Sequence, residues 1–418
     1  MKRLTKVQEM HASKLKRALL TDRLGLDCSE TGTGKTVTAL AVAKDIIKSG
    51  GVGEAIVIAP KSLLSQWKAE ITEAGLTENI KLHGSEKVSR TGIPRIINRK
   101  EKHWIWDENS KWQYGRLFIF DECDRAMGEK SKLGEVVRKL YFGANTQYIL
   151  MLSATLFTEP RRLFTIGACM KKWKNSTEFY KQLGKLGYRM VKKWGTTIYS
   201  WQVRKDEAKE VMTGMRTKVY GDITSSMKLA ERYSTLDIRE EIWYREEGDP
   251  MGDTVQSEEW TGREPYIMEM LEVNEERKQR WIVNKVPSLI DEGYSVLVCL
   301  HFIRNIKELG IKLKSYYPLV YTGDTKDNIA SFGKEGKNLL LMSAGAGAHG
   351  LNLHDEHGNS PRASIVSTST FNGNLITQAL GRINRAGQKS KSLQYILHSE
   401  NGLERAADTI MKKREVLI

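Results

Sequence analysis

Short apolar runs recur in two parts of the chain, with stretches of helix length between them. The runs of the first part are AIVIAP (55–60), RLFIF (116–120) and YILMLSAT (148–155), and those of the second part are SVLVCL (295–300), PLVYTG (318–323), NLLLMSA (338–344) and ASIVST (363–368). Runs of this length and composition are typical of strands that are buried on both faces. The helix-length connections therefore predict two α/β units, each built on a parallel sheet.

The composition is that of a globular chain with an excess of basic residues. Of the 418 residues 40% are hydrophobic, so sizeable cores can form. The net charge of +15 and the pI near 9.4 indicate a polyanionic partner, either nucleic acid or a membrane surface. No run of eighteen apolar residues occurs and the N-terminal segment lacks an apolar signal region, so we expect no membrane partner.

Four cysteines are scattered along the chain without a CxxC pair: Cys28, Cys123, Cys169 and Cys299. This pattern predicts reduced thiols in a cytosol-like compartment and argues against a zinc site.

The segment between the two predicted units reverses its charge. Residues 161–220 hold fifteen Lys/Arg against four Asp/Glu, whereas 231–275 hold four against fourteen. We predict that the basic part contacts a phosphate backbone, with a solvated helix face as the alternative. Candidate contacts are Lys171, Lys172, Lys192 and Lys193. The first unit is expected over 1–225, with this basic segment, and the second over 226–418, with the acidic segment as a protrusion.

CSETGTGKT at 28–36 gives the strongest chemical signal, because it follows an apolar segment and precedes a helical pattern. Gly32 and Gly34 let backbone N–H groups turn towards phosphate oxygens, and Lys35 would neutralise the β- and γ-phosphates. Ser29 stands where the general pattern has its first glycine. The stretch predicts an ATP-binding loop made of Thr31, Gly32, Thr33, Gly34, Lys35 and Thr36, with the Thr36 hydroxyl offered to magnesium.

FIFDECDRA at 118–126 is a hydrophobic strand that ends in two carboxylates. Asp121 would hold the magnesium ion, and Glu122 would orient and deprotonate the attacking water, because phosphoryl transfer needs mainly positioning and charge neutralisation. LSAT at 152–155 ends the next strand, and we expect it to couple ATP hydrolysis to movement of the lobes.

Two further stretches carry candidate contacts with the adenine base and with the nucleic-acid backbone. The amide of Gln8 has the donor and acceptor needed to read an adenine edge, with a surface helix glutamine as the alternative. In IAPKSLLSQWKAE (58–70), backbone phosphates are the expected partners of Lys61, Ser62 and Gln66, whereas Trp67 is expected to pack in the core.

The order TGTGKT, DECD, SAT, SAGAGAHGLNL and QALGRINRAGQ resembles helicase superfamily two, from Gln8 to Gln388. IAPKSLLSQW and RAGQ are similar to its Swi/Snf-related branch, and 148–220 resembles compact Swi/Snf-type helicases of bacteriophages. The resemblance implies two tandem RecA-like lobes of α/β fold, with helical, charged insertions between the motifs. It also implies ATP and magnesium as cofactors.

The resemblance extends to roles for residues of the second lobe. In SAGAGAHGLNL (343–353) it implies that Ser343 and Asn352 contact the nucleic-acid backbone and that Gly350 contacts ATP. In QALGRINRAGQ it implies that Gln378, Arg382 and Arg385 contact the γ-phosphate across a cleft and sense its loss. The spacing of three predicts that both arginines share one face of a helix.

Together these features predict a DNA-dependent ATPase of helicase or translocase type in viral or bacterial replication, recombination or repair. No wedge hairpin is marked in the sequence, which favours duplex- or junction-directed motion over strand separation. An RNA helicase and a passive nucleic-acid-binding module remain alternatives. QALGR, in place of the HRxGR of DEAD-box enzymes, argues against RNA. We expect a cytoplasmic monomer, in the host cytoplasm if viral, that works with phage or host replication or recombination proteins.

Overall fold

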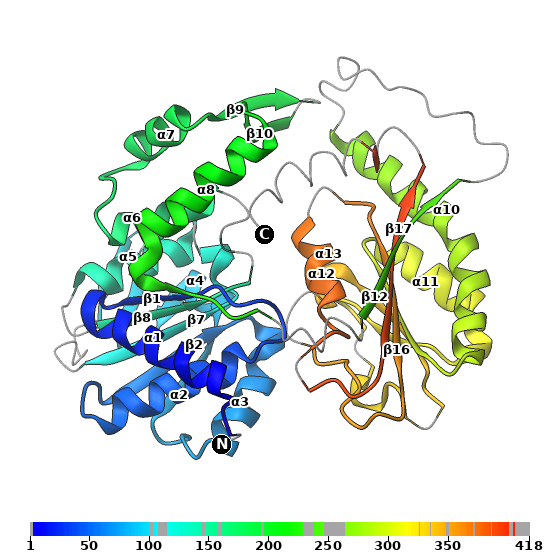
Figure 1. The fold of residues 1–418 in the computed structure, drawn as a ribbon, viewed down its shortest axis with the longest axis horizontal. Helices are drawn as coiled ribbons and strands as arrows, with labels where there is room; N and C mark the ends of the chain where they lie inside the picture. Colours follow the sequence, from blue (N-terminus) through cyan, green and yellow to red (C-terminus); the bar gives the residue numbers. More distant parts are fainter. Residues whose placement is uncertain are drawn as a thin grey trace. The chain divides into compact units, whose positions relative to one another are not determined.

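The computed structural model describes most of the chain: 3–100, 103–107, 115–126, 128–143, 147–154, 156, 160–193, 196–228, 237–245, 264–325, 327–334, 336–347, 351–370, 373–385, 387–400 and 404–405. These residues form two compact units (Figure 1). The first contains 3–189 and 201–228, and the second contains 190–200 and 237–405, apart from the gaps above. The predicted boundary at 225/226 stays a prediction.

The first unit contains a six-stranded parallel sheet in the order β11-β1-β8-β7-β2-β3. Its strands are β1 (Leu24–Asp27), β2 (Glu54–Ala59), β3 (Ile80–Gly84), β7 (Arg116–Asp121), β8 (Gln147–Leu152) and β11 (Thr224–Ser225). The predicted strands at 55–60, 116–120 and 148–155 are confirmed as β2, β7 and β8. Parallel strands end at a common edge, so the residues that follow them can form one site.

Helices cover this sheet, and the first three of them share one apolar core with it. They are α1 (Lys6–Asp22), α2 (Lys35–Lys48), α3 (Leu64–Glu73), α4 (Ser85–Thr91) and α5 (Lys132–Gly143). Leu15 of α1, Leu40 of α2 and Trp67 of α3 belong to the same core cluster. A small antiparallel sheet lies between α4 and β7 in the chain, made of β4 (Gly92–Ile93), β5 (Ile97–Lys100) and β6 (His103–Trp106).

The basic segment forms a small subdomain with its own aromatic core. Its elements are α6 (Phe164–Cys169), α7 (Ser176–Lys185), β9 (Tyr188–Lys193), β10 (Thr196–Trp201) and α8 (Lys205–Tyr220), of which residues 190–200 belong to the second unit and the rest to the first. The Phe179 ring lies 5.5 Å from Phe164 and 4.6 Å from Trp173. We call 164–220 the basic subdomain.

The basic subdomain also contains a β-hairpin, which the sequence did not predict beside its helices. Strands β9 and β10 form a two-stranded sheet of their own. At its base the rings of Tyr188 and Trp201 lie 5.0 Å apart. Gly187 has φ of 87°, and a Cβ there would lie 2.6 Å from Val203, so the base of the hairpin requires a glycine. The strands YRMVKK and TTIYSW show no regular alternation of apolar and polar residues that would have predicted them.

The second unit contains another six-stranded parallel sheet, in the order β12-β17-β16-β13-β15-β14. Its strands are β12 (Asp237–Tyr244), β13 (Ser295–Leu300), β14 (Leu319–Tyr321), β15 (Leu339–Ser343), β16 (Arg362–Ser367) and β17 (Ser392–Ser399). The four predicted strands are confirmed as β13 to β16. The acidic residues 237–244 form the edge strand β12 of this sheet, and the predicted acidic protrusion over 231–275 stays a prediction.

Helices pack on both faces of the second sheet: α10 (Glu264–Asp291), α11 (Ile303–Lys312), α12 (Ala344–Gly347) and α13 (Gly373–Leu380). Val298 of β13 packs in a cluster with residues of α10 and α11, whereas its neighbour Leu297 packs with α13. Successive residues of β13 therefore serve opposite faces, as expected of a central strand. Within the ranges described above, no helix is long and apolar enough to cross a membrane.

Candidate active site

The predicted phosphate-binding loop connects β1 to α2. Gly32 and Gly34 have φ of 86° and 91°, a left-handed conformation that residues with a Cβ rarely adopt. Gly34 is the N-cap of α2, so the loop leads directly to the unpaired N–H groups of a helix N-terminus. Residues 31–36 thus have the local geometry that an anion-binding loop requires.

Lys35 and Gln8 both bond to this loop. Nζ of Lys35 donates to the carbonyls of Ser29 (2.9 Å) and Glu30 (3.1 Å). Nε2 of Gln8 donates to the carbonyl of Thr33 (3.0 Å), and its Oε1 accepts from the N–H of Thr5 (3.0 Å). Gln8 is therefore placed against the loop, and its contact with adenine stays a prediction.

Asp121 is the last residue of β7, and a tryptophan orients it. Nε1 of Trp67 donates to Oδ2 of Asp121 (2.7 Å), while the N–H of Glu122 donates to Oδ1 (2.9 Å). Burial raises the pKa of Asp121, and the Trp67 bond and the nearby charge of Lys35 lower it. Trp67 is fully buried, as predicted, but no sequence pattern indicated that it also bonds to Asp121, the predicted magnesium ligand.

Glu122 follows in a left-handed conformation, with φ of 46°. Such a backbone costs on the order of 1–3 kcal/mol for a residue with a side chain, and it is typical of functional sites. The turn is held beyond Glu122 by an ion pair of 2.6 Å between Asp124 and Arg162. The strand end therefore presents Asp121 and Glu122 in fixed, different directions.

No disulfide joins the four cysteines, which all lie within the described residues, and three of them are buried: Cys123, Cys169 and Cys299. Burial raises the pKa of each of these three thiols. Cys28, one residue before Ser29, is partly exposed.

The candidate backbone contacts of the first unit follow β2. Lys61 and Ser62 lie in a 3-10 turn (Lys61–Leu63), and Gln66 lies in α3. The Lys61 side chain is exposed, and its backbone N–H donates to Glu86 (3.2 Å). In LSAT, the N–H of Ser153 donates to the Asp27 carbonyl (3.0 Å), and Thr155 lies outside the described residues.

In the second unit, the two predicted motifs contact each other. Nη1 of Arg385 donates to Oδ1 of Asn352 (2.6 Å), and its Nε donates to the Gly381 carbonyl (3.0 Å). Arg382 is almost completely buried, and its Nη1 lies 3.4 Å from the Leu351 carbonyl. Ser343 and Gln378 are buried, and Gly350 lies outside the described residues.

The predicted helical arrangement of the two arginines is wrong. Helix α13 ends at Leu380, where the N–H of Gly381 closes its last turn on Thr377 (3.1 Å). Arg382 then turns into the core while Arg385 remains partly exposed, so the two do not share a helix face.

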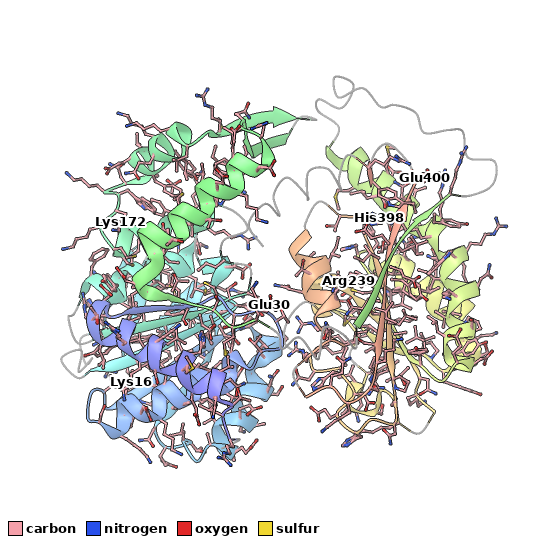
Figure 2. All side chains as sticks on the ribbon, in the orientation of Figure 1. Lys16, Glu30, Lys172, Arg239, His398 and Glu400 are labelled. Atoms are coloured by element: carbon pink, nitrogen blue, oxygen red, sulfur yellow. The ribbon has the colours of Figure 1, made fainter. Side chains whose placement is uncertain are left out.

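Of the four candidate lysines in the basic subdomain, Lys171 and Lys172 are exposed just beyond α6, and Figure 2 shows Lys172 projecting outwards. Lys171 has φ of 57°, and the N–H of Lys172 donates to the Gly167 carbonyl (2.8 Å). Lys192 and Lys193 end β9, and their side chains lie outside the described part.

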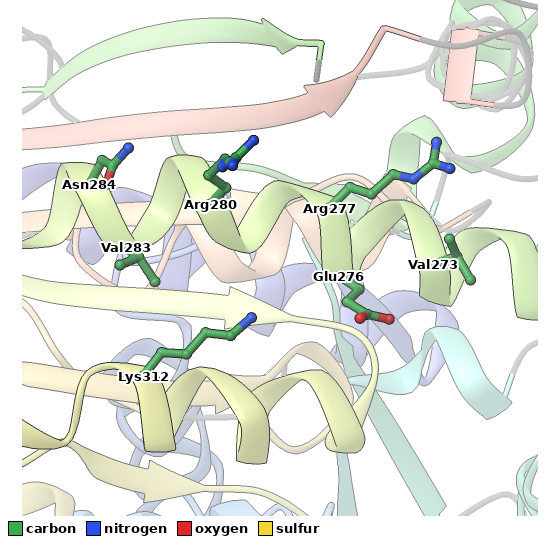
Figure 3. Close-up of a pocket in the computed structure, with 7 residues that line it drawn as sticks. All are labelled: Val273, Glu276, Arg277, Arg280, Val283, Asn284 and Lys312. Atoms are coloured by element: carbon green, nitrogen blue, oxygen red, sulfur yellow. The ribbon is translucent and has the colours of Figure 1, made fainter. Parts of the chain in front are cut away.

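A cavity of about 470 Å³ lies beside α10 and α11 in the second unit (Figure 3). It is lined by Val273, Glu276, Arg277, Arg280, Val283, Asn284 and Lys312. Three of these are basic, but Glu276 offsets part of their charge, and Lys312 donates to Gln279 (2.8 Å). This cavity was not predicted from the sequence. Arg277 and Arg280 come directly after the acidic segment 231–275, so the charge pattern did not mark its basic residues as a group.

Comparison with known proteins agrees with this geometry. Residues 11–163 match the family model of DEAD/DEAH box helicases. A protein of Acanthamoeba polyphaga mimivirus that carries the name ATP-dependent RNA helicase L364 is 23% identical over 424 residues, covering 93% of this chain and 78% of that protein. Chromatin remodeling factor mit1 of Schizosaccharomyces pombe is 24% identical over 447 residues, covering 93% of this chain but 31% of mit1.

Among solved structures, S. cerevisiae Dbp5 bound to RNA and ADP BeF3 has the same fold, with a TM-score of 0.51 at 13% identity. The match covers 99% of this chain and 88% of that one.

The sheets and the glycine loop define a protein with two RecA-like lobes and a nucleoside-triphosphate site. The first unit carries the DEAD/DEAH box helicase domain, and the chain is an ATP hydrolase of the helicase type in superfamily two. The predictions of superfamily, fold and enzyme class are confirmed.

Proposed function

We propose that this helicase-type ATPase is a motor that moves along DNA, duplex or branched, in viral or bacterial replication, recombination or repair. One observation carries the proposal: Lys35, Asp121 and Glu122 are assembled at the carboxyl edge of the first sheet, with Asp121 oriented by Trp67. An oriented pair of carboxylates serves ATP hydrolysis, whereas a module that only binds a nucleotide for structural reasons does not require one.

Magnesium fits the residues present. Thr36 lies in the first turn of α2, and Asp121 ends β7. Among the residues the structure describes, no three His, Cys, Asp or Glu side chains form a metal site. That suits Mg²⁺, which is usually held by one or two protein oxygens together with substrate phosphates and water. Bound there, the ion would neutralise charge on the phosphates, while Glu122 orients the attacking water.

The two arginines receive different roles in this proposal. Arg385 is partly exposed and is the residue we assign to the charge that develops on the transferred phosphoryl group. Arg382 is buried against the Leu351 carbonyl, and the N–H of Leu353 donates to the Arg382 carbonyl (3.1 Å). Arg382 therefore orders the 351–353 loop, which carries Asn352. Gln378 and Gly350 stay candidate nucleotide contacts.

The basic subdomain is a proposed phosphate-backbone surface, with Lys171, Lys172, Lys192 and Lys193 as contacts. Lys61, Ser62 and Gln66 are proposed to add contacts at the end of β2, and Ser343 and Asn352 in the second unit. Contacts of this kind give binding that weakens steeply with salt and shows little sequence preference.

DNA is favoured over RNA by QALGR at 378–382, where DEAD-box RNA helicases have HRxGR. The name of the mimivirus relative supports the RNA alternative, and that of mit1 supports DNA in chromatin. The chain spans less than a third of mit1, so chromatin remodelling is not proposed for it.

The test is steady-state ATPase activity with duplex DNA, single-stranded DNA or RNA added. We expect duplex DNA to stimulate turnover at least about tenfold, and Glu122→Gln to lower the stimulated rate by about a hundredfold or more. Stimulation by RNA alone would make the protein an RNA helicase. ATP binding without any stimulated turnover would leave a passive module.

Triplex displacement and fork unwinding on the same preparation then separate the motor outputs. Displacement of the third strand without unwinding is the expected result for a duplex translocase. Unwinding of a fork would instead show that the protein separates strands, and the β9–β10 hairpin would then be the candidate wedge.

A further inference from the structure

A network of buried polar side chains lies beneath the phosphate-binding loop. It joins His11 of α1, Asp27 at the end of β1, Ser29 of the loop and Ser225 at the end of β11. Their exposures are 3%, 0%, 0% and 9%. None of the four has a role in the chemistry described so far, yet burying this many polar groups is costly unless each is bonded.

The bonds of the network converge on one carboxylate oxygen. Oδ1 of Asp27 accepts from the N–H of Ser29 (3.0 Å) and from its hydroxyl, and it lies 3.0 Å from Nε2 of His11. The other ring nitrogen, Nδ1, is 2.7 Å from Oγ of Ser225. A neutral His11 with its proton on Nε2 donates to Asp27 and accepts from Ser225, so one tautomer satisfies both contacts.

The same loop residues bond to the backbone that follows β11. The N–H of Met227 donates to Oγ of Ser29 (2.9 Å), and the N–H of Glu30 donates to the Met227 carbonyl (2.9 Å). The N–H of Cys28 donates to the Ser225 carbonyl (2.8 Å). We call 225–228 the exit segment, because it ends the first unit.

Lys35 also contacts these loop residues. Its ammonium donates to the carbonyls of Ser29 and Glu30, the two residues that bond to Met227. A nucleotide phosphate would compete with both carbonyls for this ammonium. Any turn of Lys35 towards phosphate thus removes bonds from the part of the loop that holds the exit segment.

We propose that Ser29, oriented by Asp27 and His11, is a positioning residue that couples ATP binding at Lys35 to the exit segment. The inference rests on the proposed function of the loop as an ATP site. It explains why a serine stands where the general loop pattern has glycine. A glycine offers no hydroxyl to donate to Asp27 or to accept from Met227.

The experiment measures hydrogen exchange of the exit segment in the full chain, with and without the ATP analogue AMP-PNP and Mg²⁺. In the wild type we expect the analogue to change the exchange rate of 225–228 several-fold. Ser29→Ala should lose this response while its affinity for the analogue stays within about threefold. Equal responses in wild type and variant would overturn the proposal.

ATPase kinetics give a second readout. Ser29→Ala should lower kcat about five- to tenfold, the effect of one or two hydrogen bonds, with KM for ATP within about twofold. The double variant with His11→Gln should be no slower than Ser29→Ala alone, because His11 acts through Ser29. A raised KM with unchanged kcat, or multiplicative effects, would mean that the network only shapes the loop.

The matched control is Ser13→Ala, an exposed serine of α1 whose hydroxyl donates to the Glu9 carbonyl. It should behave as wild type in every assay. If His11→Gln does not fold, Ser225→Ala removes the same bond from the other side. Failure of the wild type to bind AMP-PNP would contradict the proposed function itself, whereas binding without a response at 225–228 would contradict the coupling alone.

Discussion

The two units share one sheet architecture but treat the carboxyl edges of their sheets differently. In the first unit this edge carries partly exposed groups, Lys35 and a strained Glu122, whose bonds can be exchanged for bonds to a ligand. In the second unit it carries charges that are buried and bonded to one another. The comparison shows that two sheets of the same fold can differ at their carboxyl edges. One edge carries groups that are accessible to a ligand, whereas the other carries charged groups that are buried and bonded within the unit.

The buried charges of the second unit centre on Lys278 of α10 and Glu404. Both are fully buried, with Nζ of Lys278 2.7 Å from Oε2 of Glu404 and 3.0 Å from Oγ of Ser369. Burial opposes ionisation, but the charge and bond of Lys278, together with bonds from the Ser399 N–H and the Ser369 hydroxyl, lower the pKa of Glu404. The ionised form of Glu404 is therefore favoured within the core.

A second buried carboxylate starts helix α11. Glu275 accepts from the N–H groups of His301 (2.7 Å) and Phe302 (2.9 Å) at the helix N-terminus. Burial raises the pKa of Glu275 to about 7, although both N–H donors lower it. Burial also lowers the pKa of His301 to about 4.

The largest expected effect tests the exposed edge of the first unit. Lys35→Ala should reduce ATP turnover at least about a thousandfold, because the charge on the transferred phosphates loses its neutralising partner. DNA binding, measured by anisotropy, should remain. Lys48→Ala, in the last turn of the same helix and exposed, is the control. Equal loss of binding and turnover would indicate misfolding instead.

Next in size is the buried pair of the second unit. Glu404→Gln should lower the free energy of unfolding by about 3–5 kcal/mol, since it removes one partner of a buried ion pair and leaves Lys278 in the core without it. Urea denaturation measures the effect. Replacing both residues by Met should cost less than Glu404→Gln alone. The exposed Glu400→Gln, whose carboxylate pairs with Arg405, should change little. If Glu404→Gln changed the free energy of unfolding only slightly, the buried charges would not stabilise the second unit, and the proposed difference between the two sheet edges would be wrong.

Substitutions in the basic subdomain should have an intermediate effect, on DNA binding. Replacing Lys171, Lys172, Lys192 and Lys193 by Ala should weaken duplex binding and flatten its dependence on salt, by about 0.9 in log–log slope for each phosphate that is no longer neutralised. Replacing the exposed Lys48 and Lys68, which lie outside the basic subdomain, should leave the slope unchanged. An unaltered slope in the fourfold variant would make the basic segment a solvated face.

The smallest effect concerns pH and the second unit. Between pH 4.5 and about 7 the folded state holds a proton on Glu275 that the unfolded state releases, so stability falls as pH rises. His301 acts in the opposite direction between about 4 and 6.5, because it is neutral when folded and protonated when unfolded. Glu275→Gln should therefore expose a rise in stability with pH, of at most about 1.4 kcal/mol per pH unit.

Denaturation at several pH values checks this, with the exposed neighbour Glu276→Gln as control. Parallel curves for the wild type and Glu275→Gln would show that Glu275 does not titrate in this range.

The sequence predicted those parts of the fold that local patterns specify. Continuous apolar runs marked seven strands, but β12 (DIREEIWY) was missed because an edge strand can keep charged residues on its exposed side. Strand β1 was missed because four residues are too few to show a period. Both sheets could still be inferred, since the buried central strands dominate them.

The candidate site shows the same division. Glycine spacing marked the loop, because the backbone itself requires glycine at 32 and 34. The bond from Trp67 to Asp121 joins residues 54 positions apart, and no local pattern reports such a contact. The burial of Arg382 was also missed, since the spacing of two arginines says nothing about where the helix ends.

The distribution of thiols makes the protein suitable for direct labelling. Cys123, Cys169 and Cys299 are shielded by burial, which also keeps them in the unreactive thiol form. Cys28 alone among the four is partly exposed, and it bonds to the exit segment through its backbone. A small environment-sensitive fluorophore attached under mild conditions would therefore report from the junction between the nucleotide loop and 225–228, without any engineered cysteine.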